Sequence, residues 1–193
     1  MRLPMSLSCA ILVTALVACS GAPSSAPATL TPVQITIRDV MGSVIDPSAD
    51  ALFESIQDIA DSHGITHKAP HSDADWALVQ QHLQVLSSAA DALRTPGLAA
   101  ARPEQRSAFP DIENQPEEVQ ALLGLHHDDF VRRTDALQQA AQAGLAAVDA
   151  RNTPALAAAI GHIDQACEAC HLQFWYPKDQ RARQAAREEG LMP

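Results

Sequence analysis

The fold is decided by residues 152–177, which read NTPALAAAIGHIDQACEACHLQFWYP. Asn152 is a good helix cap and Pro154 suits a first turn, so a helix is expected to begin here. Pro177 ends the pattern, because proline cannot continue a helix. Between these limits one helix face collects the apolar residues together with two cysteines and a histidine: Leu156, Ile160, Ile163, Cys167, Cys170, His171 and Phe174. The sequence therefore predicts a helix, running to about Trp175, whose cysteines point into a protein core.

The spacing of Cys167, Cys170 and His171 is that of a C-x-x-C-H motif. Positions i, i+3 and i+4 share one helix face, so two thiols and one imidazole can meet a single group. This motif is typical of c-type haem attachment, in which the thiols bond the porphyrin and the histidine binds the iron. The alternatives are a thioredoxin-like dithiol and half of a zinc site. A thioredoxin-like dithiol opens a helix after a strand, whereas this motif ends a long helical run, and a zinc site needs a second ligand pair, which the other histidines are not spaced to form. The motif therefore predicts one covalent haem c with His171 as the proximal iron ligand.

The N-terminal residues have the features of an export signal. Arg2 precedes an apolar run, from about Met5 to Ala18, that is too short for a permanent membrane span. The run ends in Leu-Val-Ala-Cys at residues 16–19, which resembles a bacterial lipobox with Cys19 as the lipidated residue. The alternative is an ordinary signal cut near Ala22 or Ala28.

The lipobox interpretation divides the chain and sets its location. Residues 1–18 are then the signal peptide and 19–32, rich in Ser, Ala and Pro, a flexible tether. We expect a lipid-anchored protein facing the periplasm, held to the membrane through the lipid alone. Cys167 and Cys170 are the cysteines that remain after Cys9 is removed and Cys19 is modified.

Three further helical patterns precede the motif helix. They run from about residue 33 to 59, 73 to 93 and 116 to 150, and 178–193 is a polar tail left open as a short helix or a frayed end. The Asp46-Pro47 step either kinks the first pattern or restarts it with Asp46 as cap. The connection between the second and third patterns is long, which is typical of a segment that crosses or covers something. We expect an all-α domain at 33–177, a four-helix bundle with haem c on its last helix.

This layout resembles the cytochrome c′ family over residues 33–177. The resemblance rests on the motif residues Cys167, Cys170 and His171 late in a helical chain, with the aromatic Phe174 three positions further on. It implies a haem pocket that includes Phe174 and a first helix that covers the other haem face. It also implies a homodimer, because family members often pair through their first helices. The chain departs from the family at Trp175, where a basic residue is usual.

The residue above the iron separates two functions. Low-spin relatives carry a methionine on the first helix, and Met41 lies on the inner stripe of the first pattern here. Met41 is our candidate sixth ligand; the alternative is a methionine that fills a core gap. His126, on the apolar side of the third pattern, is the next candidate, although such a histidine is more typical of a hydrogen-bonded core. Lys178 and the arginines that follow it meet a haem propionate or simply complete a solvated helix end.

The formal net charge of −10 excludes a nucleic-acid binder, because no basic stripe is present. The sequence shows no pairing of a nucleophile with a base of the kind that would indicate an enzyme. We therefore expect a single-electron carrier that meets a redox partner with a basic surface. A five-coordinate haem that binds a diatomic gas such as nitric oxide is the alternative. A structural or partner-binding lipoprotein remains if the motif is accidental.

Overall fold

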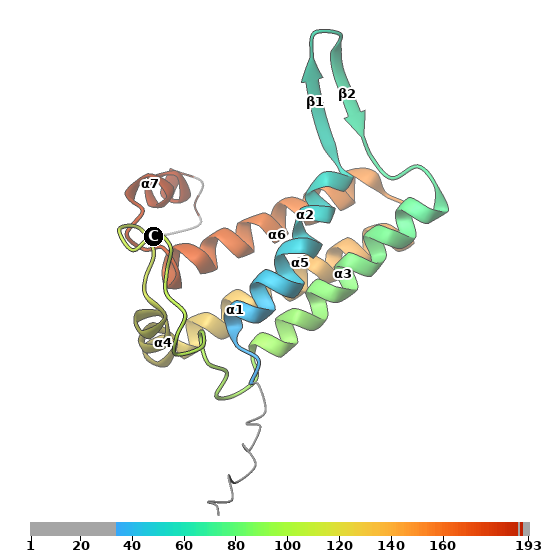
Figure 1. The fold of residues 1–193 in the computed structure, drawn as a ribbon. Coiled ribbons are helices and arrows are strands. Elements are labelled where there is room, and N and C mark those ends of the chain that lie inside the picture. Colours follow the sequence, from blue (N-terminus) through green and yellow to red (C-terminus); the bar gives the residue numbers. More distant parts are fainter. Residues whose placement is uncertain (1–33, 189, 191–193) are drawn as a thin grey trace, which may run out of the picture. The chain divides into compact units, whose positions relative to one another are not determined.

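The computed structural model describes residues 34–188 and 190, and this part of the chain is mostly helical with one small antiparallel sheet (Figure 1). The predicted signal peptide, the tether and Cys19 lie outside the described residues. Along the described chain the elements are α1 (Ile37–Val40), the π-helix η1 (Met41–Ile45), α2 (Asp46–Ser55), β1 (Gln57–Asp61), β2 (Gly64–Lys68), α3 (Asp73–Leu93), α4 (Pro116–Leu125), α5 (His127–Asp149), α6 (Thr153–Phe174) and α7 (Gln180–Glu188).

The start of α6 confirms the Asn152 cap predicted from the sequence, and the start of α3 has a cap that the sequence analysis did not name. The Ser72 hydroxyl accepts a hydrogen bond from the Asp75 backbone N–H, and the Asp75 carboxylate accepts one from the Ser72 N–H. Asn152 accepts from the Ala155 N–H at 3.1 Å, and Pro154 lies in the first turn of α6. These side chains satisfy amide groups that have no partner inside a helix.

The long helices form a core in which α5 packs along both α3 and α6. The segment made of α1, η1 and α2 packs on α3, and α2 also contacts α6. The largest fully buried side chains come from these elements and α4: Phe174, Leu52, Leu83, Leu86, Leu156, Ile163, Leu172 and Val119. Each contributes about 1.5–3 kcal/mol through burial, so apolar packing holds α6 in place. No helix in the described ranges has the length and apolar character needed to cross a membrane.

The first predicted helix is wrong beyond Ser55. The residues that follow form a hairpin, with β1 and β2 in antiparallel register and Ile59 opposite Thr66 (Figure 1). Ile59, expected on an inner helical stripe, is 45% exposed. The turn uses Gly64 at a φ of 128°, which other residues rarely adopt. The two strands extend away from the helices, and their residues are exposed or half-exposed.

The third predicted helix is interrupted at His126, whose φ of −123° and ψ of 40° separate α4 from α5. The interruption turns the His126 side chain outward, where it is 49% exposed and its Nδ1 lies 3.6 Å from Asp129. His126 is therefore not on an apolar face, and it lines neither of the cavities that His171 lines. Gly124, a weak helix former, precedes the break, and Asp128 and Asp129 favour a new helix start.

Candidate haem site

The motif residues lie together near the end of α6. Cys167 and Cys170 are free thiols, each partly buried, and they do not form a disulfide with one another. Burial raises the pKa of both thiols to about 12, and for Cys167 the neighbouring carboxylates of Asp164 and Asp46 add to this effect. Both sulfurs are therefore protonated at neutral pH, and neither is a reactive thiolate.

Met41 and His171 line the same two cavities, although 130 positions separate them in the sequence. The smaller cavity, of about 20 Å³, also contains Cys167 and Cys170, with apolar walls that include Leu93 and Leu137. The larger, of about 410 Å³, opens between α1, α4 and the residues after α6. The structure thus brings Met41 to the two cysteines and the histidine, as the resemblance implies for the first helix. Phe174 lines neither cavity; it is 2% exposed, and its ring lies 5.6 Å edge-on from that of Phe130.

The long connection between α3 and α4, residues 94–115, joins the two segments that carry Met41 and His171. The backbone N–H groups of Ile37 and Arg38 donate to Ala99 and Ala100 at 2.9 and 3.0 Å. At its other end the Asn114 N–H donates to the Trp175 carbonyl at 2.7 Å, and the Asn114 amide donates to the Phe174 carbonyl at 3.0 Å. Residues 107–109 and 113–114 line the larger cavity. The sequence indicates a covering segment, and the structure shows which helix ends it fastens.

His171 is held as a neutral imidazole by its surroundings. Burial lowers its pKa, against the opposing influence of the Glu168 and Asp46 carboxylates. The Tyr176 ring lies 5.6 Å from the His171 ring, and its hydroxyl donates to Glu168 Oε2 at 2.5 Å. Burial and this hydrogen bond raise the pKa of Tyr176. A neutral imidazole with nearby acceptors is the form that binds a metal.

Sequence reasoning missed Asp46, Asn114 and Tyr176 as parts of this site. The sequence indicates only a helix cap at Asp46, whereas in the structure Asp46 lines the larger cavity with Met41 and His171. Tyr176 follows His171, the last motif residue, by five positions, and its aromatic ring is the signal available. Lys178, considered for a propionate, lies 3.3 Å from Glu118 Oε2 instead.

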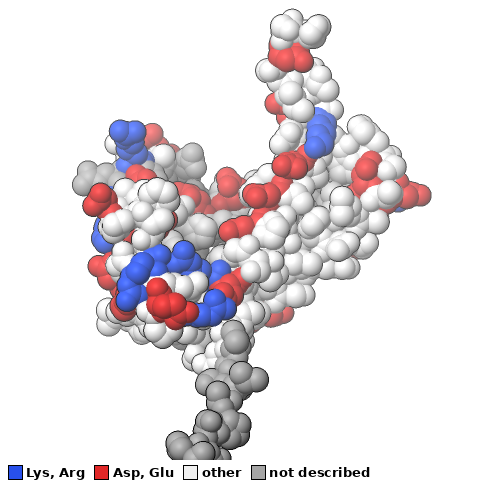
Figure 2. Space-filling view, in the orientation of Figure 1, with Lys and Arg blue, Asp and Glu red and all other residues white. Residues whose placement is uncertain are grey.

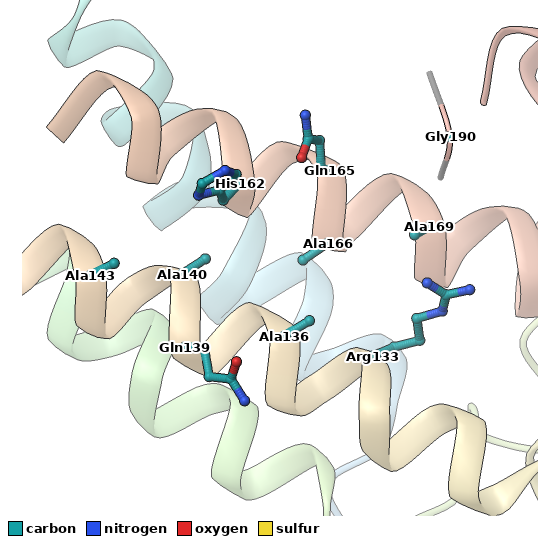
Figure 3. A pocket seen from close by; sticks show the side chains of 10 residues that line it. All are labelled: Arg133, Ala136, Gln139, Ala140, Ala143, His162, Gln165, Ala166, Ala169 and Gly190. Carbon is teal, nitrogen blue, oxygen red and sulfur yellow. The ribbon is translucent and has the colours of Figure 1, made fainter. Parts of the chain in front are cut away.

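A separate groove of about 440 Å³ runs between α5 and α6 (Figure 3). Alanines form most of its floor: Ala136, Ala140, Ala143, Ala166 and Ala169. Their small side chains allow the two helices to approach closely. The groove is lined by neither motif cysteine nor His171, and it shares Arg133 and Ala166 with the smaller cavity of the candidate haem site.

The residues around the two cavities fit a covalent haem. Two neighbouring thiols, one buried neutral imidazole and one thioether line the apolar cavity of about 20 Å³. The imidazole and the thioether also line the more polar cavity of about 410 Å³, a volume within the usual range for ligands, about 300–1,000 Å³. Residues 34–188 and 190 hold no group of three His, Cys, Asp or Glu side chains arranged for a metal ion. A haem asks for fewer protein ligands, because the porphyrin nitrogens supply the rest.

The chain was compared with protein-family models, with curated proteins and with solved structures, and none of these matches it. The assignment of the site therefore rests on its own residues and their geometry.

Proposed function

We propose that the protein is a c-type cytochrome that carries single electrons through one covalent haem c. The observation that supports this most strongly is the meeting of Met41 with Cys167, Cys170 and His171 around shared cavities. In this proposal α1–η1–α2, α3, α4–α5 and α6 are the four members of a bundle of the cytochrome c′ type, with the haem on the last.

Each site residue has a distinct role in the proposal. Cys167 and Cys170 hold the group through thioether bonds, His171 is the proximal ligand and Met41 the sixth, and Phe174 packs behind the pocket. The haem supplies reversible one-electron chemistry, and a His/Met ligand pair raises its reduction potential. Leu93, Leu137 and Ile45 exclude water from the side that faces the core.

The surface charge supports a protein partner with a basic surface. The chain carries 23 acidic and 13 basic residues, and acidic side chains are spread over the face shown in Figure 2. Two arginines of the connection before α4 are paired, Arg102 with Asp39 at 2.9 Å and Arg106 with Glu117 at 3.5 Å, whereas Arg38, which lines the larger cavity, donates to the Arg106 carbonyl at 3.0 Å. The remaining negative field would steer a basic redox partner towards the protein. We propose no catalytic activity and no binding of nucleic acid.

Location belongs to the same proposal. A lipid on Cys19 would hold the protein at a bacterial membrane, facing the periplasm, with 19–32 as tether. Cys19→Ala should release the protein into the soluble periplasmic fraction with its absorption spectrum unchanged. A wild-type protein whose mass shows no acyl group would contradict the anchor without affecting the haem assignment.

Haem attachment is tested on the purified full chain. Acidified acetone should leave the haem with the protein, and denaturing gels should keep their haem stain. In Cys167→Ala/Cys170→Ala the haem should become extractable, whereas Cys19→Ala, which removes a cysteine outside the motif, serves as the control and should keep its haem. Haem that leaves the wild-type chain into the organic phase would refute the proposal.

The second candidate function is gas binding, and the larger cavity favours it. This cavity reaches both Met41 and His171 and has room for a small ligand. If Met41 binds the iron, wild-type protein should be low-spin and slow to bind carbon monoxide. Met41→Ala should then be high-spin and bind it readily. A wild-type protein that is already high-spin and binds carbon monoxide would favour the gas-binding function.

A further inference from the structure

The segment that carries Met41 is a π-helix, an uncommon conformation. In η1, Met41–Ile45, the Asp46 N–H donates to the Met41 carbonyl, five residues back, instead of four as in an α-helix. Such single widened turns are frequent at functional sites. The widened turn here begins at the candidate sixth ligand.

Pro47 explains why the turn is widened at this point. Proline has no N–H to donate to the Ser43 carbonyl, and its ring collides with that carbonyl in a regular α-helix. Pro47 occupies the first turn of α2, directly after η1. In a regular α-helix the Asp46 N–H would donate to the Gly42 carbonyl, whereas here it donates to the Met41 carbonyl. This change relieves the collision at Pro47 and lets the helix continue without a break.

The widened turn changes which side chains share a side of the helix. In an α-helix, residues five apart lie about 140° apart around the axis, so Met41 and Asp46 would face different neighbours. In η1 the hydrogen bond joins these two residues, and both line the cavity that contains His171. The core residues of the flanking helices remain buried: Ile37 and Val40, which precede the π-turn, and Leu52, which follows it.

We infer that Pro47 is a positioning residue: by forcing the π-turn, it directs the Met41 sulfur and the Asp46 carboxylate together towards His171. This inference rests on the proposed function, because it assigns Met41 to the iron. It adds that the sixth ligand is set by a backbone device outside the C-x-x-C-H motif. Pro47 itself makes no contact with the haem in this account.

Pro47→Ala tests the inference on the full-length haem protein. The restored N–H permits a regular α-helix, which rotates α1 by about 100° relative to α2 and takes Met41 out of the cavity. We expect loss of the weak sulfur-to-iron absorption band of the ferric form, a high-spin spectrum and carbon monoxide binding. Haem stain on denaturing gels should not change.

Two further variants separate positioning from general destabilisation. Pro154→Ala is the matched control, because Pro154 occupies the same early position in α6 with no π-turn before it. It should keep the sulfur-to-iron band. Combining Pro47→Ala with deletion of the exposed Ser43 removes the extra residue of the turn, restores the relative rotation of the flanking helices and should recover the band.

The outcomes distinguish this inference from the proposed function. A wild-type chain without covalent haem refutes the function and the inference together. A wild-type chain with haem and the sulfur-to-iron band, in which Pro47→Ala also keeps the band, overturns the inference alone. Failure of the Ser43 deletion to recover the band also overturns the inference. A wild-type chain that holds haem but lacks the band overturns it too, because Met41 then does not bind the iron.

Discussion

Gly144 shows how closely α3 and α5 approach one another. A Cβ at this position would lie 2.6 Å from Leu83 Cδ2 and 3.0 Å from Leu83 Cδ1. Leu83 is 0% exposed and cannot move aside freely. Overpacking of this kind costs about 1–3 kcal/mol, more than the gain of roughly 1 kcal/mol in helix propensity. Gly144→Ala should therefore lower the free energy of unfolding, measured by denaturant titration.

Gly161 provides the matched control for this prediction. It also lies within a long helix, α6, but an added Cβ would meet nothing within 4 Å. Gly161→Ala should raise the free energy of unfolding by up to about 1 kcal/mol through helix propensity. If both variants shift stability in the same direction, the steric account of Gly144 fails.

The candidate site could be predicted in part at this scale. Helical periodicity places Cys167, Cys170 and His171 on one face of a helix and Met41 on the inner stripe of another. That these two helices face one another is what the family resemblance implies, and the four residues line one cavity. The roles of Asn114 and Tyr176 depend on how a loop and a helix end fold back, and no local pattern encodes that. His126 failed because the prediction assumed one unbroken helix through it.

The hairpin of β1 and β2 is the element with least connection to the core. Its residues are exposed or half-exposed, including Ile65 at 66%. A two-stranded hairpin alone is marginally stable. Since Gln57 and Lys68 are paired at its base, a short Gly-Ser linker can replace 57–68. The shortened protein should keep its helical circular dichroism and its unfolding midpoint. A large fall in the midpoint would show that the hairpin stabilises the helices.

The connection at residues 94–115 should behave differently from the hairpin. Asn114 is 6% exposed, and its amide donates to the Phe174 carbonyl at the end of α6. Asn114→Ala leaves that carbonyl without this donor, at a cost of about 1–3 kcal/mol. Amide exchange should rise at 171–177. Gln105→Ala, which removes only a local bond to the Arg102 N–H, is the control and should leave exchange there unchanged.

Element boundaries were predictable where a cap and a periodic pattern agree. The prediction of 73–93 matches α3, and that of the motif helix matches α6, whose start Asn152 marks in the sequence. The hairpin was missed because Ile56 and Ile59 continue a helical spacing by coincidence. Residues 57–68 form a hairpin because of tertiary and turn preferences, which the spacing of apolar residues does not reveal.

Acid stability is a property of the whole molecule, because carboxylates begin three separate helical segments. Asp39, Asp75 and Glu118 each close a capping box at the start of α1, α3 and α4. The Thr36 hydroxyl is the main cause of the lowered pKa of Asp39, and the backbone N–H groups of Ser72 and Gln115 act likewise on the other two.

A carboxyl whose pKa is lower in the folded state stabilises the fold above its unfolded value, and this contribution disappears as the pH falls through the folded pKa. Asp46 acts in the opposite sense, because partial burial raises its pKa. Asp39, Asp75 and Glu118 lose stabilisation as the pH falls, and Asp46 alone acts in the opposite sense. The free energy of unfolding should therefore fall between about pH 5 and pH 3. The triple variant Asp39→Asn/Asp75→Asn/Glu118→Gln should be less stable at pH 7 and show a flatter dependence over this range. An unchanged slope in that variant would assign acid unfolding to groups other than the caps.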